Sequence, residues 1–507
     1  MTVYNLNFRI LGDARKNPEK LRWSTTDEFM IVHSTEKREN FLKIYLDDIL
    51  SIKDSEEVPE SLEIIFYPLV NSRRERQRGA IFGENFLNFG IELKLRLKPP
   101  IPPHLPMKLK NRKILVLINP FSGQKKALNL YNTFCRPVFL DAGIECEIRY
   151  TKSQNHGTEI VQNLDIDNYE SIAIVSGDGL VNEVITGLLI RGDRERALKF
   201  PILHIPGGTA NALAASVAFK SGEPFSPRGG FCKEMTLMGS RPVFRKLRLN
   251  HFEGEKEGHK CMFLSAVWGL FADIDICSER FRWAGMIRLH MEAFIRIMQL
   301  PTVAKYKGTV SYLPINDDEI IRKTRLRWNE ARKKFGKKHF AGGHVDEIVN
   351  PDLFSELKSK RISIEKSFEN QAVTKMTSLR DPVPSDWITV SGEFVYVMVS
   401  SASHLGSDLP YMPMTKLEEE ILYLTIIDWK VVQNRIQVAG MFVEMDHCAH
   451  LDYRCFQVIP VLACRIEPEP GTGGCVAVDG EPCTRGSSFQ AVSTNLCATV
   501  VSRQLRD

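Results

Sequence analysis

An aspartate, Asp178, stands between two glycines where an apolar strand gives way to a helix. The strand, 172–175, runs into Ser-Gly-Asp-Gly at 176–179, and apolar residues follow at helical spacing over 180–189. That helix begins at the glycines, so its amide N–H groups and its dipole form a ready anion site. A carboxylate there repels phosphate unless it handles a hydroxyl proton, a metal ion or both. The structural alternative is that Asp178 only caps the helix.

The same strand–turn–helix design occurs on both sides of this segment. The strand 113–118 leads into Asn-Pro-Phe-Ser-Gly at 119–123, and the strand 202–205 leads into Pro-Gly-Gly-Thr-Ala-Asn at 206–211. Glycine has no Cβ and lets the backbone approach a phosphate closely. One such turn is a weak signal, whereas three in order are hard to obtain by chance. Repeated βα units predict a mostly parallel sheet covered by helices.

These turns, with segments nearer the C-terminus, resemble the lipid kinases of the diacylglycerol kinase superfamily, most closely its sphingosine kinases. The later segments are Ala-Asp-Ile-Asp at 272–275, Ser-His-Leu-Gly at 403–406 and Val-Asp-Gly-Glu at 478–481. The resemblance spans roughly Lys110 to Thr499. A serine before Gly-Asp-Gly is typical of the sphingosine and ceramide branch, and Ala-Asp-Ile-Asp favours sphingosine over ceramide.

The resemblance implies an ATP- and Mg²⁺-dependent kinase that converts a sphingoid base to its 1-phosphate, releasing ADP. Asp178 would accept or orient the proton of the primary hydroxyl. Asp275 matches the position that recognises the amine, and Asp273 would hold the backbone. A carboxylate in apolar surroundings is costly unless paired, and a protonated amine would be the partner. An internal ion pair of Asp275 with Arg280 or Arg282 is the alternative.

Further positions are carried over from the family's pattern, with no set of metal ligands among them. Four match the lining of the lipid tunnel: Phe271, Ile274, Leu289 and His404. The positions expected to bind the nucleotide are Asn119, Pro120, Ser122, Gly123, Lys126, Thr151, Ser176, Gly177, Gly179, Glu183, Gly207, Gly208, Thr209, Asn211, Arg282, Arg288, Asp479, Gly480 and Glu481. The chain has Phe121 and Gln124 where the family often has basic residues, which places more of the phosphate neutralisation on the two arginines.

Three rival functions stay open at this point. One is a kinase for ceramide or diacylglycerol, and another is a silent regulator that only binds lipid or phosphoinositide. The third is an NAD kinase, which shares a Gly-Asp-Gly turn but does not account for 272–275 or 478–481. A zinc site at His447, Cys448, His450 and Cys455 is disfavoured because it lacks two clean ligand pairs.

Composition limits the class of protein. The 507 residues are 43% hydrophobic and 25% charged, with a formal net charge of +5, which gives no reason to expect a nucleic-acid partner. Eleven cysteines without a C-x-x-C pair fit a reducing cytoplasm. The start lacks the features of a signal peptide, and no apolar run is long enough to span a bilayer. We therefore expect a cytoplasmic enzyme that meets anionic membranes peripherally, with a homodimer as an open option.

The order of patterns predicts the domain organisation. Residues 1–98 carry short strand patterns at 29–33, 41–46, 49–52 and 62–67, which favour a small β-rich module, with a pleckstrin-homology-like fold as one option. A proline-rich linker, 99–109, precedes an α/β nucleotide-binding kinase domain with a parallel sheet over 110–242. Residues 243–507 predict a β-rich, sandwich-like lipid-binding domain with a charged insertion at about 315–385 and one helix from about Trp283 to Leu300. The basic run 73–78 is interpreted as a solvated loop, with phosphoinositide contact as the second option.

Overall fold

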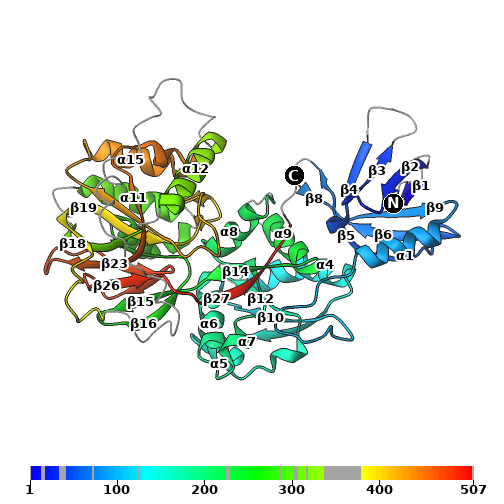
Figure 1. Cartoon of the computed structure of the whole chain (residues 1–507), viewed down its shortest axis with the longest axis horizontal. Coiled ribbons are helices and arrows are strands. Elements are labelled where there is room, and N and C mark those ends of the chain that lie inside the picture. Colours follow the sequence, from blue (N-terminus) through cyan, green and yellow to red (C-terminus); the bar gives the residue numbers. More distant parts are fainter. Residues whose placement is uncertain are drawn as a thin grey trace.

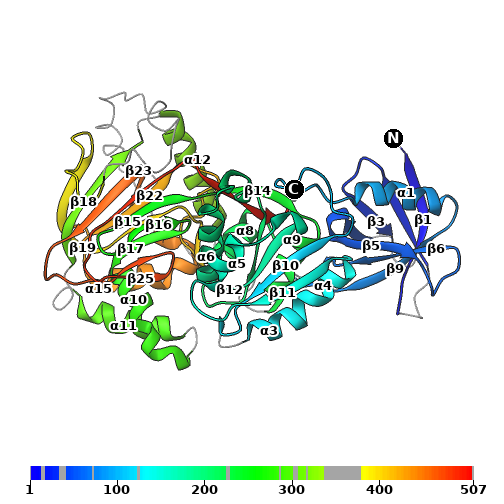
Figure 2. The same ribbon diagram turned by 90° about the horizontal axis from the view of Figure 1, so that it is seen from below.

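The computed structural model describes residues 2–12, 18–33, 41–70, 73–122, 126–223, 229–284, 287–300, 306–315, 318–335 and 378–504. Three lobes lie in a row, with the kinase domain between the N-terminal module and the β-rich domain (Figures 1 and 2). Among the described residues, no helix is both long and apolar enough to cross a membrane.

The N-terminal module is a seven-stranded antiparallel sheet with one helix. The strand order is β4-β3-β2-β1-β9-β6-β5. The elements are β1 (Val3–Ile10), β2 (Glu19–Ser24), β3 (Phe29–His33), β4 (Phe41–Tyr45), β5 (Ile49–Asp54), β6 (Ser61–Phe66), β7 (Leu69–Val70), β8 (Arg73–Arg74), β9 (Gln77–Phe82) and α1 (Phe86–Arg96). Phe89 and Leu93 of α1 pack into the apolar core of this sheet. The predicted strands at 29–33, 41–46, 49–52 and 62–67 are confirmed, and β1, β2 and β9 were not predicted.

The kinase domain contains the predicted parallel sheet. Its order is β11-β10-β12-β13-β27-β14, in which all neighbours except β27 and β14 run parallel. The elements are β10 (Lys113–Ile118), α3 (Ala127–Leu130), α4 (Arg136–Asp141), β11 (Glu145–Tyr150), α5 (His156–Gln162), β12 (Ser171–Ser176), α6 (Asp178–Leu189), α7 (Arg194–Ala197), β13 (Ile202–Pro206), α8 (Ala212–Lys220), α9 (Gly229–Ser240), β14 (Val243–Arg248) and β27 (Cys497–Ser502).

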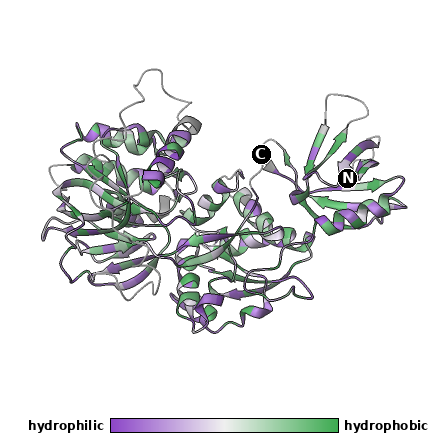
Figure 3. Ribbon diagram, viewed as in Figure 1, coloured by the Kyte–Doolittle hydropathy of each residue, from purple (hydrophilic) through white to green (hydrophobic). Residues whose placement is uncertain are grey.

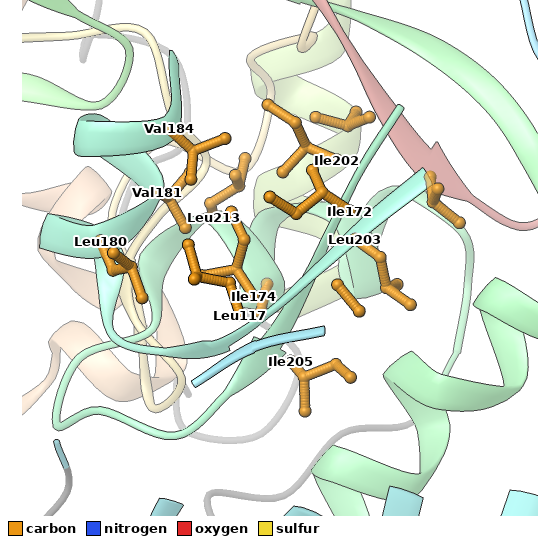
Figure 4. Packing of buried hydrophobic residues seen from close by; sticks show 14 of the residues in the cluster. Leu117, Ile172, Ile174, Leu180, Val181, Val184, Ile202, Leu203, Ile205 and Leu213 are labelled. Atoms are coloured by element: carbon orange, nitrogen blue, oxygen red, sulfur yellow. The ribbon is translucent and has the colours of Figure 1, made fainter. Parts of the chain in front are cut away.

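The sheet core positions the three turns. Apolar side chains of β12 and β13, such as Ile174 and Leu203, pack with Val181 and Val184 of α6 and Leu213 of α8 (Figure 4). Because β10, β12 and β13 are parallel neighbours, their carboxyl ends lie at one edge of the sheet. The turns that follow these strands are therefore brought together.

The C-terminal region is β-rich, as predicted, with one ten-stranded sheet and a separate two-stranded sheet of β20 and β21. The order is β16-β15-β26-β23-β18-β19-β17-β24-β25, with β22 pairing to β19 and β23. The elements are β15 (Asn250–Gly254), β16 (Gly258–Met262), β17 (Ser265–Gly269), α10 (Leu270–Cys277), α11 (Ile287–Gln299), β18 (Tyr306–Pro314), α12 (Asp318–Phe335), β19 (Ile388–Ser400), β20 (His404–Gly406), β21 (Leu409–Pro410), β22 (Leu422–Asp428), α15 (Arg435–Val443), β23 (Gln457–Pro468), β24 (Val476–Val478), β25 (Glu481–Cys483) and β26 (Phe489–Val492). β18 and β22 pair with different halves of the long strands β19 and β23.

The sheets do not follow the boundary expected at 242/243. β14 and β27 come from the stretch assigned to the lipid-binding domain, yet they complete the kinase sheet. The last strand, β27, lies between β13, to which it runs parallel, and β14, to which it runs antiparallel. The C-terminal end of the chain thus returns to the kinase sheet. The charged insertion, expected at about 315–385, begins with the helix α12, and its 336–377 portion lies outside the described residues.

In the basic run 73–78, the described arginines Arg74, Arg76 and Arg78 are held in ion pairs, so the expectation of a solvated loop is wrong for them. Arg74 is buried and forms ion pairs with Asp48 of the module and with Glu223 and Glu234 of the kinase domain. Arg503, just after β27, also pairs with Asp48 and Glu223. The network joins the module, the kinase domain and the segment that follows β27.

Candidate active site

The three glycine turns are in contact with one another, the second and third through their backbones and the first through a side chain. The amide of Gly207 donates to the carbonyl of Ser176 at 2.9 Å, and the hydroxyl of Ser122 donates to the carbonyl of Gly207 at 3.2 Å. A Cβ on Gly208 would lie 2.4 Å from the Cα of Gly177, so no other residue fits there without a backbone shift. The predicted phosphate cradle is thus one contiguous surface rather than three separate loops.

Asp178 is the first residue of α6, and its carboxylate is bonded to a different helix. Oδ2 accepts the amide of Ala212 at 2.9 Å, and Oδ1 accepts the amide of Leu213 at 3.0 Å. These are the first amides of α8, while the cap position of α6 is occupied by Gly177. Asp178 therefore lies at the positive ends of two helices, a location that stabilises its charge and attracts phosphate.

Other polar residues of the predicted nucleotide site maintain the turns. The side chain of Asn211, whose backbone is left-handed (φ 56°), accepts from the amide of Gly208 and donates to its carbonyl. Glu183 accepts the amide of Gly157 at 2.8 Å and thereby fixes α5 against α6. Asn119 accepts the amide of Phe121 at 2.9 Å.

The remaining predicted positions of the first and third turns differ in exposure. Thr151, next to the end of β10, is buried, and its amide donates to Ile118. Lys126 and Thr209 are exposed, and Pro120 is partly exposed. Gly123 and the side chain of Arg282 lie outside the described residues.

Asp273 and Asp275 lie on α10 but differ in their surroundings. Two residues along a helix place the two carboxylates on different faces. Asp273 is buried and accepts the hydroxyl of Tyr306 at 2.8 Å and the amide of Cys475 at 2.7 Å. The carboxylate of Asp275 makes no hydrogen bond or ion pair with any described residue. Of its two expected alternative partners, Arg280 instead pairs with Glu292, and the side chain of Arg282 lies outside the described residues.

The electrostatic surroundings of Asp275 are unusual for a carboxylate. Burial raises its pKa to about 6, the nearby Glu481 adds to this effect, and Arg288 opposes it. Arg288 is itself buried and pairs with Glu279. A cationic ligand beside Asp275 would replace the missing counter-charge.

The turn after β24 connects the two halves of the site. Asp479 is buried, and its carboxylate accepts the amides of Phe263, Leu264 and Ser265 and the side-chain amide of Asn182 on α6. Burial raises the pKa of Asp479 to about 7 against these donors. With four bonds, this carboxylate has no oxygen left for nucleotide or metal in this conformation.

Glu481, two residues on, is exposed and lies against the start of α6. A Cβ on Gly179 would lie 2.7 Å from its Oε1. Gly480 has φ 82°, which lets the chain turn between the two acids. Since Glu481 also influences Asp275, this turn brings the α6 end and the α10 carboxylate into one region.

Several comparisons with known proteins bear on this geometry. A family profile described as the diacylglycerol kinase catalytic domain matches residues 113–234. Human sphingosine kinase 1 is 30% identical over 372 residues, covering 73% of this chain and 85% of the human protein. The chain belongs to the sphingosine kinase family. Sphingosine kinase 1 of Caenorhabditis elegans is 28% identical over 382 residues, with 73% and 77% coverage. A solved structure described as a diacylglycerol kinase from Bacillus anthracis aligns at 15% identity, with a TM-score of 0.41 and coverage of 78% and 98%.

The positions matched to the family's lipid tunnel lie in two places. Phe271 belongs to an aromatic cluster in which its ring lies 5.6 Å from Tyr396, 6.1 Å from Tyr411 and 5.7 Å from Phe442. Ile274 is buried in the same apolar core, and Leu289 of α11 packs against it. His404 lies instead against α8: its amide donates to Ser216 and its ring is 5.0 Å from that of Phe219. Burial lowers the pKa of His404 to about 3, so it is neutral.

Sequence reasoning missed two features of this family member's site. The segment 270–277 was not recognised as a helix. The structure shows that this helix, α10, begins directly after Gly269, whose backbone has φ 99°. His204 was treated as part of a strand, yet its Nδ1 lies 3.8 Å from Oδ1 of Asp178. A histidine interrupting an apolar strand was the only available signal. The described residues contain no group of three or more His, Cys, Asp or Glu side chains able to hold a metal ion.

Proposed function

We propose that this chain is an ATP-dependent kinase that transfers the γ-phosphate of ATP to the primary hydroxyl of sphingosine and related sphingoid bases. The observation that carries the proposal is Asp275, a carboxylate of raised pKa with no partner among the described residues. A sphingoid base supplies the missing cation, whereas ceramide and diacylglycerol are neutral. The neutral-lipid kinase and the silent regulator therefore explain less of this site.

The roles of this chain's residues follow from their positions. The turns with Gly177, Gly207 and Gly208 hold the phosphates on backbone amides, and the ends of α6 and α8 stabilise their charge. Asp178 accepts the proton of the substrate hydroxyl or orients that hydroxyl toward the γ-phosphorus. Asp275 holds the amine, which is on the carbon next to the one that bears the hydroxyl. Mg²⁺ bound with ATP neutralises phosphate charge, and no residue is assigned as its ligand.

A peripheral contact with anionic membrane, from the cytoplasm, is part of the proposal. α11 and α15 are neighbours, since Arg435 donates to the carbonyl of Met298, and they present Phe294 and Ile436 at 69% and 75% exposure. This apolar surface adjoins the aromatic cluster through Phe442 of α15. Exposed apolar side chains beside an arginine fit a bilayer surface, from which an insoluble substrate must be taken.

A homodimer through the N-terminal module, which we propose is pleckstrin-homology-like, is a second part. Leu87, Ile91 and Leu95 form a stripe along α1, each at least half exposed, with hydrophilic residues beside them (Figure 3). Two copies packed antiparallel about Ile91 would place Leu87 against Leu95, and Glu84 against Lys98. The stripe is thus self-complementary in shape and charge. Sedimentation of wild type beside Ile91→Glu tests this, and identical monomeric profiles would refute it.

The experiment that tests the function is transfer of labelled phosphate from ATP·Mg²⁺ to a panel of lipids. We expect transfer to sphingosine and dihydrosphingosine but not to ceramide or diacylglycerol. Transfer to a neutral lipid at a similar rate would overturn the role of Asp275. Absence of transfer to every lipid by folded protein would favour the regulator.

A further inference from the structure

His204 is a fully buried histidine on β13 whose position beside Asp178 has no structural explanation as core packing alone. Its Nε2 lies 3.0 Å from the backbone carbonyl of Ser176. A carbonyl oxygen only accepts, so Nε2 carries a proton and donates it. The tautomer of the neutral ring is thereby fixed, and Nδ1 has a free lone pair.

The nearest charged group to Nδ1 is another acceptor, the carboxylate of Asp178. Nδ1 of His204 lies 3.8 Å from Oδ1 of Asp178 and has no hydrogen-bond partner among the described residues. With a neutral ring, Nδ1 is a buried polar atom without a hydrogen-bond partner among the described residues, and it faces a carboxylate oxygen that already accepts the amide of Leu213. The separation of 3.8 Å is too long for a hydrogen bond, but a proton on Nδ1 turns the contact into an ion pair between the imidazolium and the carboxylate.

The other bonds of Asp178 leave room for this proton and for a substrate. Oδ1 accepts one amide, that of Leu213, and Oδ2 accepts one amide, that of Ala212. Each oxygen of a carboxylate has two acceptor sites. Oδ1 can therefore face His204 while Oδ2 faces a substrate hydroxyl.

Asp178 is the only charged side chain within ion-pair distance of His204 among the described residues. β12 and β27 carry no charged side chain, and on α8 the single one, Lys220, bonds to the carbonyl of Pro413. On α9, the thiol of Cys232 donates to Pro206, and burial raises its pKa to about 12.

The charged residues of α9 are engaged elsewhere. Lys233 and Glu234 both contact Arg74. Burial lowers the pKa of His204, and Asp178 opposes this effect. Proton binding by His204 thus depends on the Asp178 carboxylate and on any further negative charge brought to the turn.

We propose that His204 and Asp178 hold one proton as a pair, which makes His204 the positioning residue for the carboxylate and lets that carboxylate stand beside nucleotide phosphates. The inference rests on the proposed function and deepens it. The phosphates of ATP favour the protonated pair, so nucleotide binding takes up a proton.

In the transfer, Oδ2 receives the proton of the substrate O–H bond, a new O–P bond forms, and the bond from the γ-phosphorus to ADP breaks.

The first test needs no activity. A pH titration of ¹⁵N-histidine-labelled protein is followed by NMR in wild type and in Asp178→Asn. The protonation midpoint of His204 falls by more than about one pH unit when Asp178 is neutral. His104 is the internal control: it is buried, its Nε2 bonds to the carbonyls of Ile166 and Tyr169, and its Nδ1 has no partner. Equal His204 midpoints in both proteins would overturn the pairing.

The second test measures protons taken up when Mg²⁺ and a non-hydrolysable ATP analogue bind, by calorimetry in two buffers of different ionisation enthalpy. Wild type and His104→Gln take up part of a proton near neutral pH, and His204→Gln does not. In kinetics, His204→Gln raises KM for ATP several-fold, changes kcat less, and removes the pH dependence of that KM. Equal proton uptake in all three proteins would overturn the proposal.

The two proposals fail in different ways. If wild type binds the analogue but phosphorylates no lipid, the proposed function fails and the proton pair stands. If the analogue does not bind, nucleotide use is refuted, and the NMR titration still decides whether the pair exists. A melting temperature for His204→Gln equal to that of His104→Gln identifies both as equally folded.

Discussion

The two halves of the site differ in whether their carboxylates have hydrogen-bond donors. In the kinase domain, Asp178 and Glu183 accept backbone amides of neighbouring helices, and Asn211 closes its own turn. In the β-rich domain, Asp273 is bonded in the same manner, but the carboxylate of Asp275, on another face of α10, has no partner among the residues that the structure describes. Among the described residues, the carboxylates of the kinase half already have backbone donors, whereas Asp275 of the lipid half has none.

This difference indicates where binding energy is used. A turn whose polar groups are already satisfied keeps its shape before ATP arrives, so little ordering is needed on binding. A half-buried carboxylate of raised pKa gains most from a cation, because the cation removes the cost of its burial. The first half provides geometry, and the second provides selectivity between charged and neutral lipids.

Replacing Asp178 by Asn tests the kinase half with the largest expected effect. We expect kcat to fall by about 10²–10⁴-fold, because the group that takes or orients the hydroxyl proton is lost. Asp165→Asn is the control, since Asp165 also accepts a backbone amide at a helix start. Phosphate transfer and thermal unfolding are measured together. Turnover above a tenth of wild type in Asp178→Asn would contradict the assignment.

Replacing Asp275 by Asn tests the lipid half. We expect kcat/KM for sphingosine to fall by about 10²-fold, because a close charge pair is lost, while KM for ATP changes little. Asp273→Asn is the matched control from the same helix and should lower stability more than selectivity. A similar loss of sphingosine turnover in both variants at equal stability would remove the distinction between the two faces of α10.

Glycine 208 tests whether the kinase half is preformed. Gly208→Ala places a Cβ 2.4 Å from the Cα of Gly177, so the cradle must open. We expect KM for ATP to rise by about tenfold or more. Gly192→Ala, whose Cβ would meet nothing within 4 Å, should behave as wild type. An unchanged KM in Gly208→Ala would show that the close approach is not needed.

The pH dependence of substrate binding sharpens the contrast. The pKa of Asp275 is raised to about 6, so its charge is present above that pH and is lost as the pH falls through it. KM for sphingosine should therefore rise by about tenfold one unit below pH 6. In Asp275→Asn, the same KM should be high and flat over this range. A flat profile in wild type would show that its charge does not bind the amine.

Arg74 provides the smallest expected effect on turnover. Arg74→Met leaves Glu234 without its cation and leaves Asp48 and Glu223 with Arg503 alone, which costs about 3–5 kcal/mol of unfolding free energy. The kcat of the folded protein should change less than about twofold, because no residue of the network is assigned to the nucleotide or lipid site. Arg196→Met, in an exposed ion pair, should cost below about 1 kcal/mol. A large loss of kcat at unchanged stability would make the network part of catalysis.

Local patterns predicted much of the kinase half. β10, β12, β13 and α6 follow from apolar runs and glycine turns within a few residues of each other, and such signals do not depend on distant chain. The β-rich half was predicted in outline only. α10 was missed because its eight residues are nearly all apolar, so no helical period is visible. Without a predicted helix, the sequence did not show that Asp273 and Asp275 lie on different faces.

The sequence by itself determined the chemistry: the types and order of the glycine turns, Asp178 and the acids at 273 and 275 are legible without a fold. Tertiary structure decided which of these groups are satisfied. Asp178 meets α8, Asp479 meets the strand start at Ser265, and Arg74 meets acids of the kinase domain through contacts of large sequence separation. Such partners depend on how strands from both ends of the chain pair, and no local pattern encodes that pairing.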